Sequence, residues 1–145
     1  TTLASLMGPG SHGTTYGGSP LACAAATAVL NELAKPELLA NVRARSEQIL
    51  STLAGWKHPL IREVRGLGLL LGVELDAAQI SRPENTTASL HLSTKLLEAG
   101  LLAPPAGPLT LRLLPPLNVT ADEVEQALDI LRGVLDSLIQ PSDPS

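Results

Sequence analysis

Residues 11–20 read SHGTTYGGSP and join a loop rich in glycine and hydroxyl groups to the start of a predicted helix. Ser19 is a favoured N-cap residue, and Pro20 suits the first helical position because its missing N–H would have no partner there. Free backbone N–H groups, hydroxyls and the positive end of a helix together suit an oxyanion such as phosphate. A tight turn followed by a well-capped helix would explain the same residue types, so composition alone leaves both interpretations open.

The remaining composition narrows the class of protein. The chain has 145 residues and a net charge of −4, and its ten basic residues are scattered, which argues against a nucleic-acid partner. No apolar run reaches the length of a membrane span and no targeting segment is visible, so we expect a soluble, cytoplasmic protein without a membrane partner. Cys23 is the single cysteine, and its alanine-rich surroundings predict a small buried residue. The histidines show no metal-ligand spacing: Ser11–His12 is too weak a pair to indicate a nucleophile, and we expect His58 and His91 at the surface.

Hydrophobic periodicity predicts helices and strands in alternation. Residues 20–34 and 36–55 are predicted helices, with Leu21 and Leu33 on the apolar face of the first, and we expect both helices to pack in a core. Strands are predicted at 61–65, 69–75, 101–103 and 109–113, with a polar loop at 76–85 and a helix at 86–98. Gly66 and Gly68 indicate a bend or bulge, and the strand at 69–75, apolar on both faces, is expected to be central. A capping box of Thr120 and Glu123 begins the last helix. The pattern is typical of a small α/β layer with helices packed on a sheet.

Three segments resemble one known family. Residues 12–26, HGTTYGGSPLACAAA, are similar to a signature of class III aminotransferases, which use pyridoxal phosphate (PLP), and in particular of the acetylornithine aminotransferases and their relatives. Residues 64–75, VRGLGLLLGVEL, and residues 111–120, LRLLPPLNVT, resemble strand-forming segments of the family's C-terminal domain. The three matches occur in the family's order and cover nearly the whole chain.

The resemblance implies a domain organisation. It identifies the chain as the C-terminal part of a PLP-dependent transferase of fold type I. Residues 1–35 would end the large PLP-binding domain and begin the interdomain helix, residues 36–140 would form the small α/β domain, and residues 141–145 a disordered tail. None of Lys35, Lys57 and Lys95 lies in a context like that of the family's Schiff-base lysine, which precedes this region. We therefore expect no catalytic residue and no activity in this chain alone, and a homodimer that shares its active sites in the parent enzyme.

The resemblance also assigns roles to three side chains. Thr15 matches the position that hydrogen-bonds the cofactor phosphate across the dimer, and Thr14 the neighbouring position that contacts the acylated amino-acid substrate. Arg112 matches the arginine that binds the α-carboxylate of the amino-acid or 2-oxo-acid substrate. Its fork suits a two-point contact, although an ion pair with Glu63 or Glu74 on a neighbouring strand is the structural alternative. No metal site is predicted.

The expected activity of the parent protein is transfer of an amino group from N-acetylornithine, or a similar ω-amino donor, to 2-oxoglutarate, as in arginine biosynthesis. Ornithine, succinylornithine, acetyl-lysine and 4-aminobutyrate aminotransferases stay open as alternatives within the family. Two further alternatives are a non-catalytic binding or oligomerisation module and an anion-binding domain unrelated to PLP.

Overall fold

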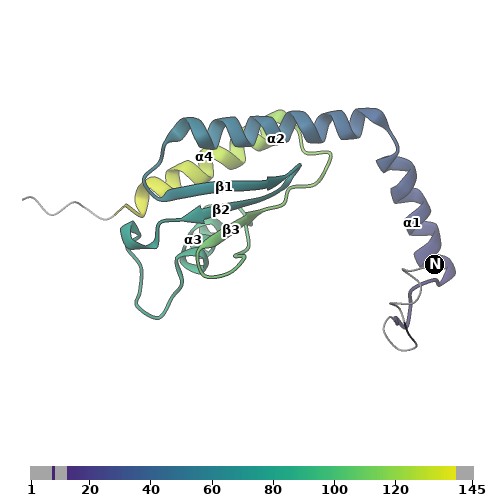
Figure 1. The fold of residues 1–145 in the computed structure, drawn as a ribbon, viewed down its shortest axis with the longest axis horizontal. Coiled ribbons are helices and arrows are strands. Elements are labelled where there is room, and N and C mark those ends of the chain that lie inside the picture. The colour runs from purple at the N-terminus through teal and green to yellow at the C-terminus, as the bar shows by residue number, and fades with distance from the viewer. Residues whose placement is uncertain (1–7, 9–12, 140–145) are drawn as a thin grey trace, which may run out of the picture. The chain divides into compact units, whose positions relative to one another are not determined.

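The computed structural model describes Gly8 and residues 13–139 (Figure 1). The chain divides into two compact units, the first ending at Leu38 and the second beginning at Leu39. The predicted succession of helices and strands is largely confirmed. Residues 1–7 and 9–12, which include the Ser11–His12 pair, and residues 140–145, which include the predicted tail, lie outside the described residues. The helices are α1 (Pro20–Leu33), α2 (Pro36–Trp56), α3 (Ala88–Glu98) and α4 (Ala121–Ser137); the strands are β1 (Ile61–Leu67), β2 (Leu70–Leu75) and β3 (Thr110–Leu113); and η2 (Ala77–Gln79) is a 3-10 helix.

Three antiparallel strands form one sheet in the order β1-β2-β3, so the segment predicted to be central is central. A two-residue turn joins β1 to β2, with Gly68 at its first position and a φ of 58°, as in a type II′ hairpin turn. Gly66 has a φ of 146°, and a Cβ there would lie 2.1 Å from the carbonyl oxygen of Leu70. The register irregularity of β1 lies between Ile61 and Glu63, away from both glycines.

Within the described residues of the second unit, the helices cover one face of this sheet (Figure 1). The strand predicted at 69–75 is apolar on both faces, but only one of them is buried: Leu71, Val73 and Leu75 are buried, whereas Leu70 is exposed. The second unit contains a single apolar core to which the sheet, α2, α3 and α4 all contribute (Figure 1). Its most deeply buried side chains are Leu53, Leu60, Leu69, Leu71, Val73, Leu75, Ile80, Leu92, Leu96, Leu111, Leu131 and Leu135.

Residues 101–103, predicted as a strand, have no regular structure. The N–H of Leu101 donates to the carbonyl oxygen of Leu96 at 2.8 Å, a bond that closes the end of α3 after Gly100. The carbonyl oxygen of Ala103 accepts the hydroxyl of Ser93 at 2.7 Å. These backbone groups are thus engaged by α3. The predicted loop at 76–85 contains η2, which Asp76 caps by accepting from the N–H of Ala78 at 3.1 Å.

The first helix begins as predicted but packs differently. The hydroxyl oxygen of Ser19 accepts from the N–H of Ala22 at 3.3 Å, and Pro20 is the first helical residue. No residue of α1 is buried, and Cys23 is exposed, so the predicted core packing of this helix and the burial of Cys23 are both wrong. A helix buries small side chains only where another element covers them, and in the described part of the first unit α1 is followed only by the first residues of α2.

His58, expected at the surface, is buried with 5% of its area exposed. Its Nδ1 accepts the N–H of Leu60 at 3.1 Å, which leaves Nε2 to carry the proton and donate to Asp136 of α4, also at 3.1 Å. The imidazole therefore joins the start of the sheet to the last helix.

Candidate sites for an oxyanion and for a carboxylate

The loop before α1 presents two threonine hydroxyls to solvent. The N–H of Gly17 donates to the hydroxyl oxygen of Thr14 at 3.2 Å, and a Cβ on Gly17 would lie 2.0 Å from Cγ2 of Thr14. Glycine at this position is what lets the turn close. Thr15 is exposed, and its hydroxyl has no hydrogen-bond partner among the described residues.

This donor set fits the phosphate end of a cofactor such as PLP. The hydroxyl of Thr15 has no partner among the described residues, and the hydroxyl of Thr14 accepts from Gly17 and keeps its own proton to donate. Both lie just before the capped N-terminus of α1, whose dipole favours negative charge.

No lysine of the chain lies in an enclosed site. Lys35 pairs with Glu32 at 2.6 Å on the surface of α1, and Lys95 pairs with Glu98 at 2.8 Å on α3. Lys57 is exposed, with a positive φ of 48°, in the turn that follows α2. The described side chains therefore fit the phosphate of PLP and offer no buried amine for its aldehyde. No group of three or more metal-binding side chains occurs within the described ranges.

Arg112 occupies the face of the sheet that the helices leave uncovered, which we call the open face (Glu63, Arg65, Leu67, Leu70, Gly72, Glu74, Thr110 and Arg112). The predicted alternation of β3 is confirmed, because Leu111 is buried and Arg112 is exposed. Its own backbone N–H donates to the carbonyl oxygen of Pro104 at 2.9 Å. Arg112 thus projects from a strand held on both edges.

The guanidinium of Arg112 has no ion-pair or hydrogen-bond partner in the described part of the chain. Its alternative partners are both engaged by Arg65, whose Nη1 donates to Glu74 at 2.5 Å and to Glu63 at 3.1 Å. The predicted alternative of an Arg112 ion pair is therefore not formed. The hydrogen bond to Glu74 is also the main reason why the pKa of Arg65 is raised.

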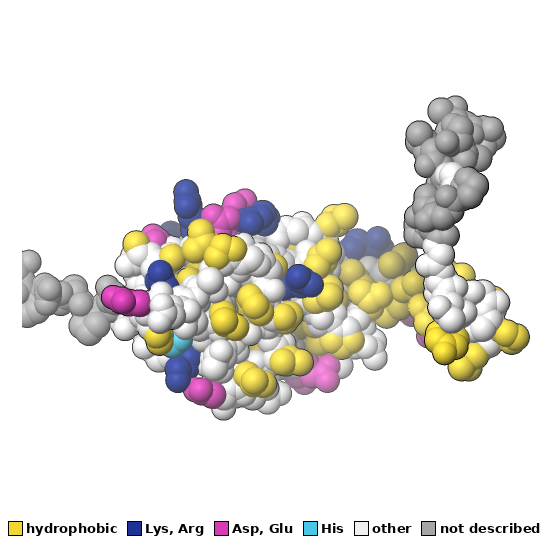
Figure 2. Space-filling view, turned by 90° about the horizontal axis from the view of Figure 1, so that it is seen from below, with side chains coloured by type: hydrophobic (Ala, Val, Ile, Leu, Met, Phe, Trp, Pro, Cys, Tyr) yellow, Lys and Arg dark blue, Asp and Glu magenta, His cyan; other side chains and the backbone are white. Residues whose placement is uncertain are grey.

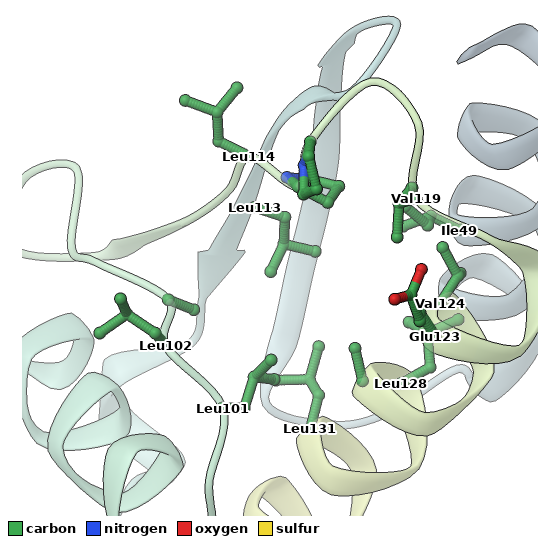
Figure 3. A pocket seen from close by; sticks show the side chains of 14 residues that line it. Ile49, Leu101, Leu102, Leu113, Leu114, Val119, Glu123, Val124, Leu128 and Leu131 are labelled. Carbon is green, nitrogen blue, oxygen red and sulfur yellow. The ribbon is translucent and has the colours of Figure 1, made fainter. Parts of the chain in front are cut away.

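A pocket that sequence reasoning missed lies in the second unit. It is a cavity of about 270 Å³ between residues 101–103, the end of β3 and the first turns of α4, where Leu113 and Leu131 point into it (Figure 3). The only charged side chain in its lining, Glu123, is engaged by the cap of α4. The pairs of adjacent leucines at 101–102 and 113–114 are the feature of the sequence that could have indicated this pocket, since all four line it. Leu102 and Leu114 are exposed. Figure 2 shows apolar side chains among charged ones on the face of the second unit that it presents. The pocket offers apolar contact and no free reactive group.

Comparison with known proteins shows the family of this chain. The sequence matches the family model "Aminotransferase class-III" over residues 1–135. The chain belongs to the class-III aminotransferases. The class-III aminotransferases are PLP-dependent, which confirms the predicted cofactor. The solved structures that match this chain are PLP-dependent aminotransferases, which confirms the predicted fold class.

The relatives place the chain near two kinds of aminotransferase. It is 46% identical to the acetylornithine aminotransferase of Synechocystis sp. over 90% of the chain and 30% of that protein, and 42% identical to that of Streptomyces coelicolor over 92% and 31%. Among solved structures, the ornithine aminotransferase of Toxoplasma gondii has a TM-score of 0.75 at 31% identity over 95% of this chain and 32% of its own, and the acetylornithine aminotransferase of Elizabethkingia anophelis a TM-score of 0.74 at 30% identity over 93% and 34%. The chain thus spans about a third of the length of these class-III relatives.

In the described part of the chain no helix is both long and apolar enough to cross a membrane.

Proposed function

We propose that this chain is the C-terminal part of a class-III aminotransferase that moves the amino group of N-acetylornithine, or of a similar ω-amino donor, to 2-oxoglutarate. The observation that carries the proposal is the unpaired guanidinium of Arg112 on the open face, since a free arginine fork suits the α-carboxylate that amino-acid and 2-oxo-acid substrates share. The 46% identity to an acetylornithine aminotransferase supports this choice of donor, and with it a role in arginine biosynthesis.

Each proposed site residue has one task. Arg112 binds the substrate carboxylate in a two-point contact and so orients the substrate. Thr15 donates its free hydroxyl to the phosphate of PLP in the partner subunit of a homodimer, and Thr14 contacts the acylated end of the donor. When bound, PLP supplies the electron sink for the transfer of the amino group. The lysine that this chemistry also requires would come from outside these 145 residues.

The donor is the finer part of the proposal. An ornithine aminotransferase and an acetylornithine aminotransferase match the fold almost equally, with TM-scores of 0.75 and 0.74. The backbone of this region therefore does not discriminate between an acylated and a free ω-amino donor. Thr14, whose hydroxyl can still donate, is the described side chain best suited to contact an acyl oxygen.

A chimera tests the proposal. The C-terminal region of the Synechocystis acetylornithine aminotransferase is replaced by this chain, and glutamate formation is measured with N-acetylornithine, ornithine or 4-aminobutyrate as donor and 2-oxoglutarate as acceptor. We expect transfer from N-acetylornithine to be the fastest, and none from the 145-residue chain alone. A folded chimera that binds PLP but forms no glutamate from any of the donors would contradict the proposed function.

A further inference from the structure

Two arginines flank one glycine on the open face. Arg65 of β1 and Arg112 of β3 both lie directly opposite Gly72 of β2, one on each side. Residues directly opposite each other in a sheet share a face, so the two guanidinium groups leave the sheet on the same side. Gly72 has no side chain to fill the space between them.

Glu74 is placed where either arginine could bind it. It lies two residues along β2 from Gly72 and on the same face, and so it is a diagonal neighbour of both Arg65 and Arg112. Diagonal neighbours are about 7–8 Å apart and within reach of long side chains. Glu74 is bound to Arg65, at 2.5 Å, and has only 22% of its side chain exposed.

The charges of this cluster leave one unit of positive charge. Arg65 also binds Glu63 at 3.1 Å, and Arg62 approaches Glu74 at 3.9 Å. Together with Arg112, these side chains form a cluster of three arginines and two glutamates, in which Arg62 lies at the register irregularity of β1 beside the open face. Arg112 is the arginine of the three with no carboxylate partner, so the excess positive charge resides on it.

We propose that Arg65 is a positioning residue that keeps Arg112 free for the substrate carboxylate by holding and neutralising Glu74 and Glu63. The inference rests on the proposed function and deepens it. It explains how Arg112 stays without a partner among the described residues although Glu74 is its diagonal neighbour on β2. Without the positive charge of Arg65, Glu74 competes with the substrate for Arg112, and the positive potential of the face is cancelled.

The test measures Arg112 in the 145-residue chain directly. 4-Carboxyphenylglyoxal is an arginine-selective reagent that carries a carboxylate, and peptide mass spectrometry gives its rate of addition to Arg112. The variants are Arg65→Gln, Arg65→Lys and the double variant Arg65→Gln with Glu74→Gln. Arg132→Gln is the matched control, because Arg132 is also paired with a carboxylate, Asp136 at 3.5 Å, but on α4.

In Arg65→Gln we expect modification of Arg112 to be about threefold slower at low salt. The substitution removes one positive charge, so the net charge within reach of Arg112 becomes more negative by one unit. The double variant restores the charge balance without restoring the ion pair, so the rate returns to that of the wild type, and Arg65→Lys stays close to it. A purely structural role of the ion pair predicts the opposite, with the double variant as impaired as the single one. An unchanged rate in Arg65→Gln, or an equal loss in Arg132→Gln, would overturn the inference.

The same substitutions in the chimera separate this inference from the proposed function. We expect Arg65→Gln to raise the KM for 2-oxoglutarate about threefold with little change in kcat, and the double variant to reverse the increase. An inactive wild-type chimera whose isolated chain still shows the predicted reactivity pattern refutes the proposed function alone. An active chimera without that pattern refutes the role of Arg65 alone.

Discussion

The guanidinium of Arg112 is available because of where its neighbours in other strands lie. Leu111 turns into the core, so Arg112 must turn away from it, and that much follows from the alternation of a strand. Whether an exposed arginine is free or paired depends on the register of three strands. Arg65, two residues from Glu63 and diagonal to Glu74, takes both carboxylates.

The fork of Arg112 can be tested apart from its charge. In the chimera, Arg112→Lys keeps the positive charge but loses the planar two-point contact, so we expect the KM for 2-oxoglutarate to rise about tenfold. Arg43→Lys, on the exposed surface of α2, is the control and should leave KM unchanged. Steady-state kinetics measure both. Equal KM values for the two variants would rule out a two-point carboxylate contact at Arg112.

A second prediction at the residue scale concerns Gly66. With a φ of 146° and the carbonyl oxygen of Leu70 only 2.1 Å from the place of a Cβ, Gly66→Ala forces the hairpin to move. We expect it to lower the free energy of unfolding by about 2–4 kcal/mol. Gly133→Ala, at an exposed position in α4 with no atom near its added Cβ, should raise it by about 0.5–1 kcal/mol. Urea unfolding of the 145-residue chain distinguishes these opposite signs.

At the scale of an element, α4 shows how much a local pattern can predict. Thr120 and Glu123 form the predicted capping box, in which each side chain binds the backbone N–H of the other residue, at 3.3 and 2.8 Å. The apolar side chains that recur on one face of α4 are buried: Val124, Leu128, Leu131 and Leu135. By contrast, the strand predicted at residues 101–103 is not formed. The backbone of these residues bonds to α3, and a local pattern does not show where that helix ends.

The capping box makes part of the stability depend on pH. Hydrogen bonds from the backbone and hydroxyl of Thr120 lower the pKa of Glu123 from its ordinary value of 4.5. A lowered carboxylate pKa adds stability that is fully present above pH 4.5 and is lost as the pH falls through the folded-state pKa. Glu123→Gln should therefore be less stable than the wild type at pH 7, with a smaller difference at pH 3.

Thr120→Ala removes the other half of the box and should cost about 1 kcal/mol at pH 7. Urea unfolding at the two pH values measures both variants. A Glu123→Gln deficit that is the same at pH 3 and pH 7 would show that the ionised carboxylate does not contribute to the cap.

At the scale of the whole molecule, the two units differ in how many of their apolar side chains are buried. The second unit buries its leucines in one core, whereas α1 of the first unit buries none and leaves Leu21, Val29 and Leu30 exposed. The described residues therefore derive their stability from the second unit.

This asymmetry predicts two different costs for the same chemical change. Leu135→Ala removes a fully buried side chain and should lower the free energy of unfolding by about 2–5 kcal/mol. Leu30→Ala removes a side chain that is 64% exposed and should change it by less than about 0.5 kcal/mol. Urea unfolding of the 145-residue chain provides both values, and a comparable loss for Leu30→Ala would show that α1 packs in the folded chain.

Local sequence determined the elements of this protein and the chemistry that they carry. The cap of α1 at Ser19, the alternation around Arg112 and the box at Thr120 each depend on residues within four positions of one another, so propensity and periodicity were sufficient to predict them. The family signature lies in such segments too, and for that reason the class of enzyme could be predicted before the fold was seen.

Tertiary structure decided which of those side chains are covered and which are free. Cys23 and His58 were both assigned to the wrong environment, because burial depends on what packs against a residue: no described residue covers Cys23, whereas Asp136 and Leu60 engage His58. Arg112 is unpaired for the same kind of reason. Contacts between residues far apart in the chain depend on strand register and helix placement, which only the complete packing of the core determines.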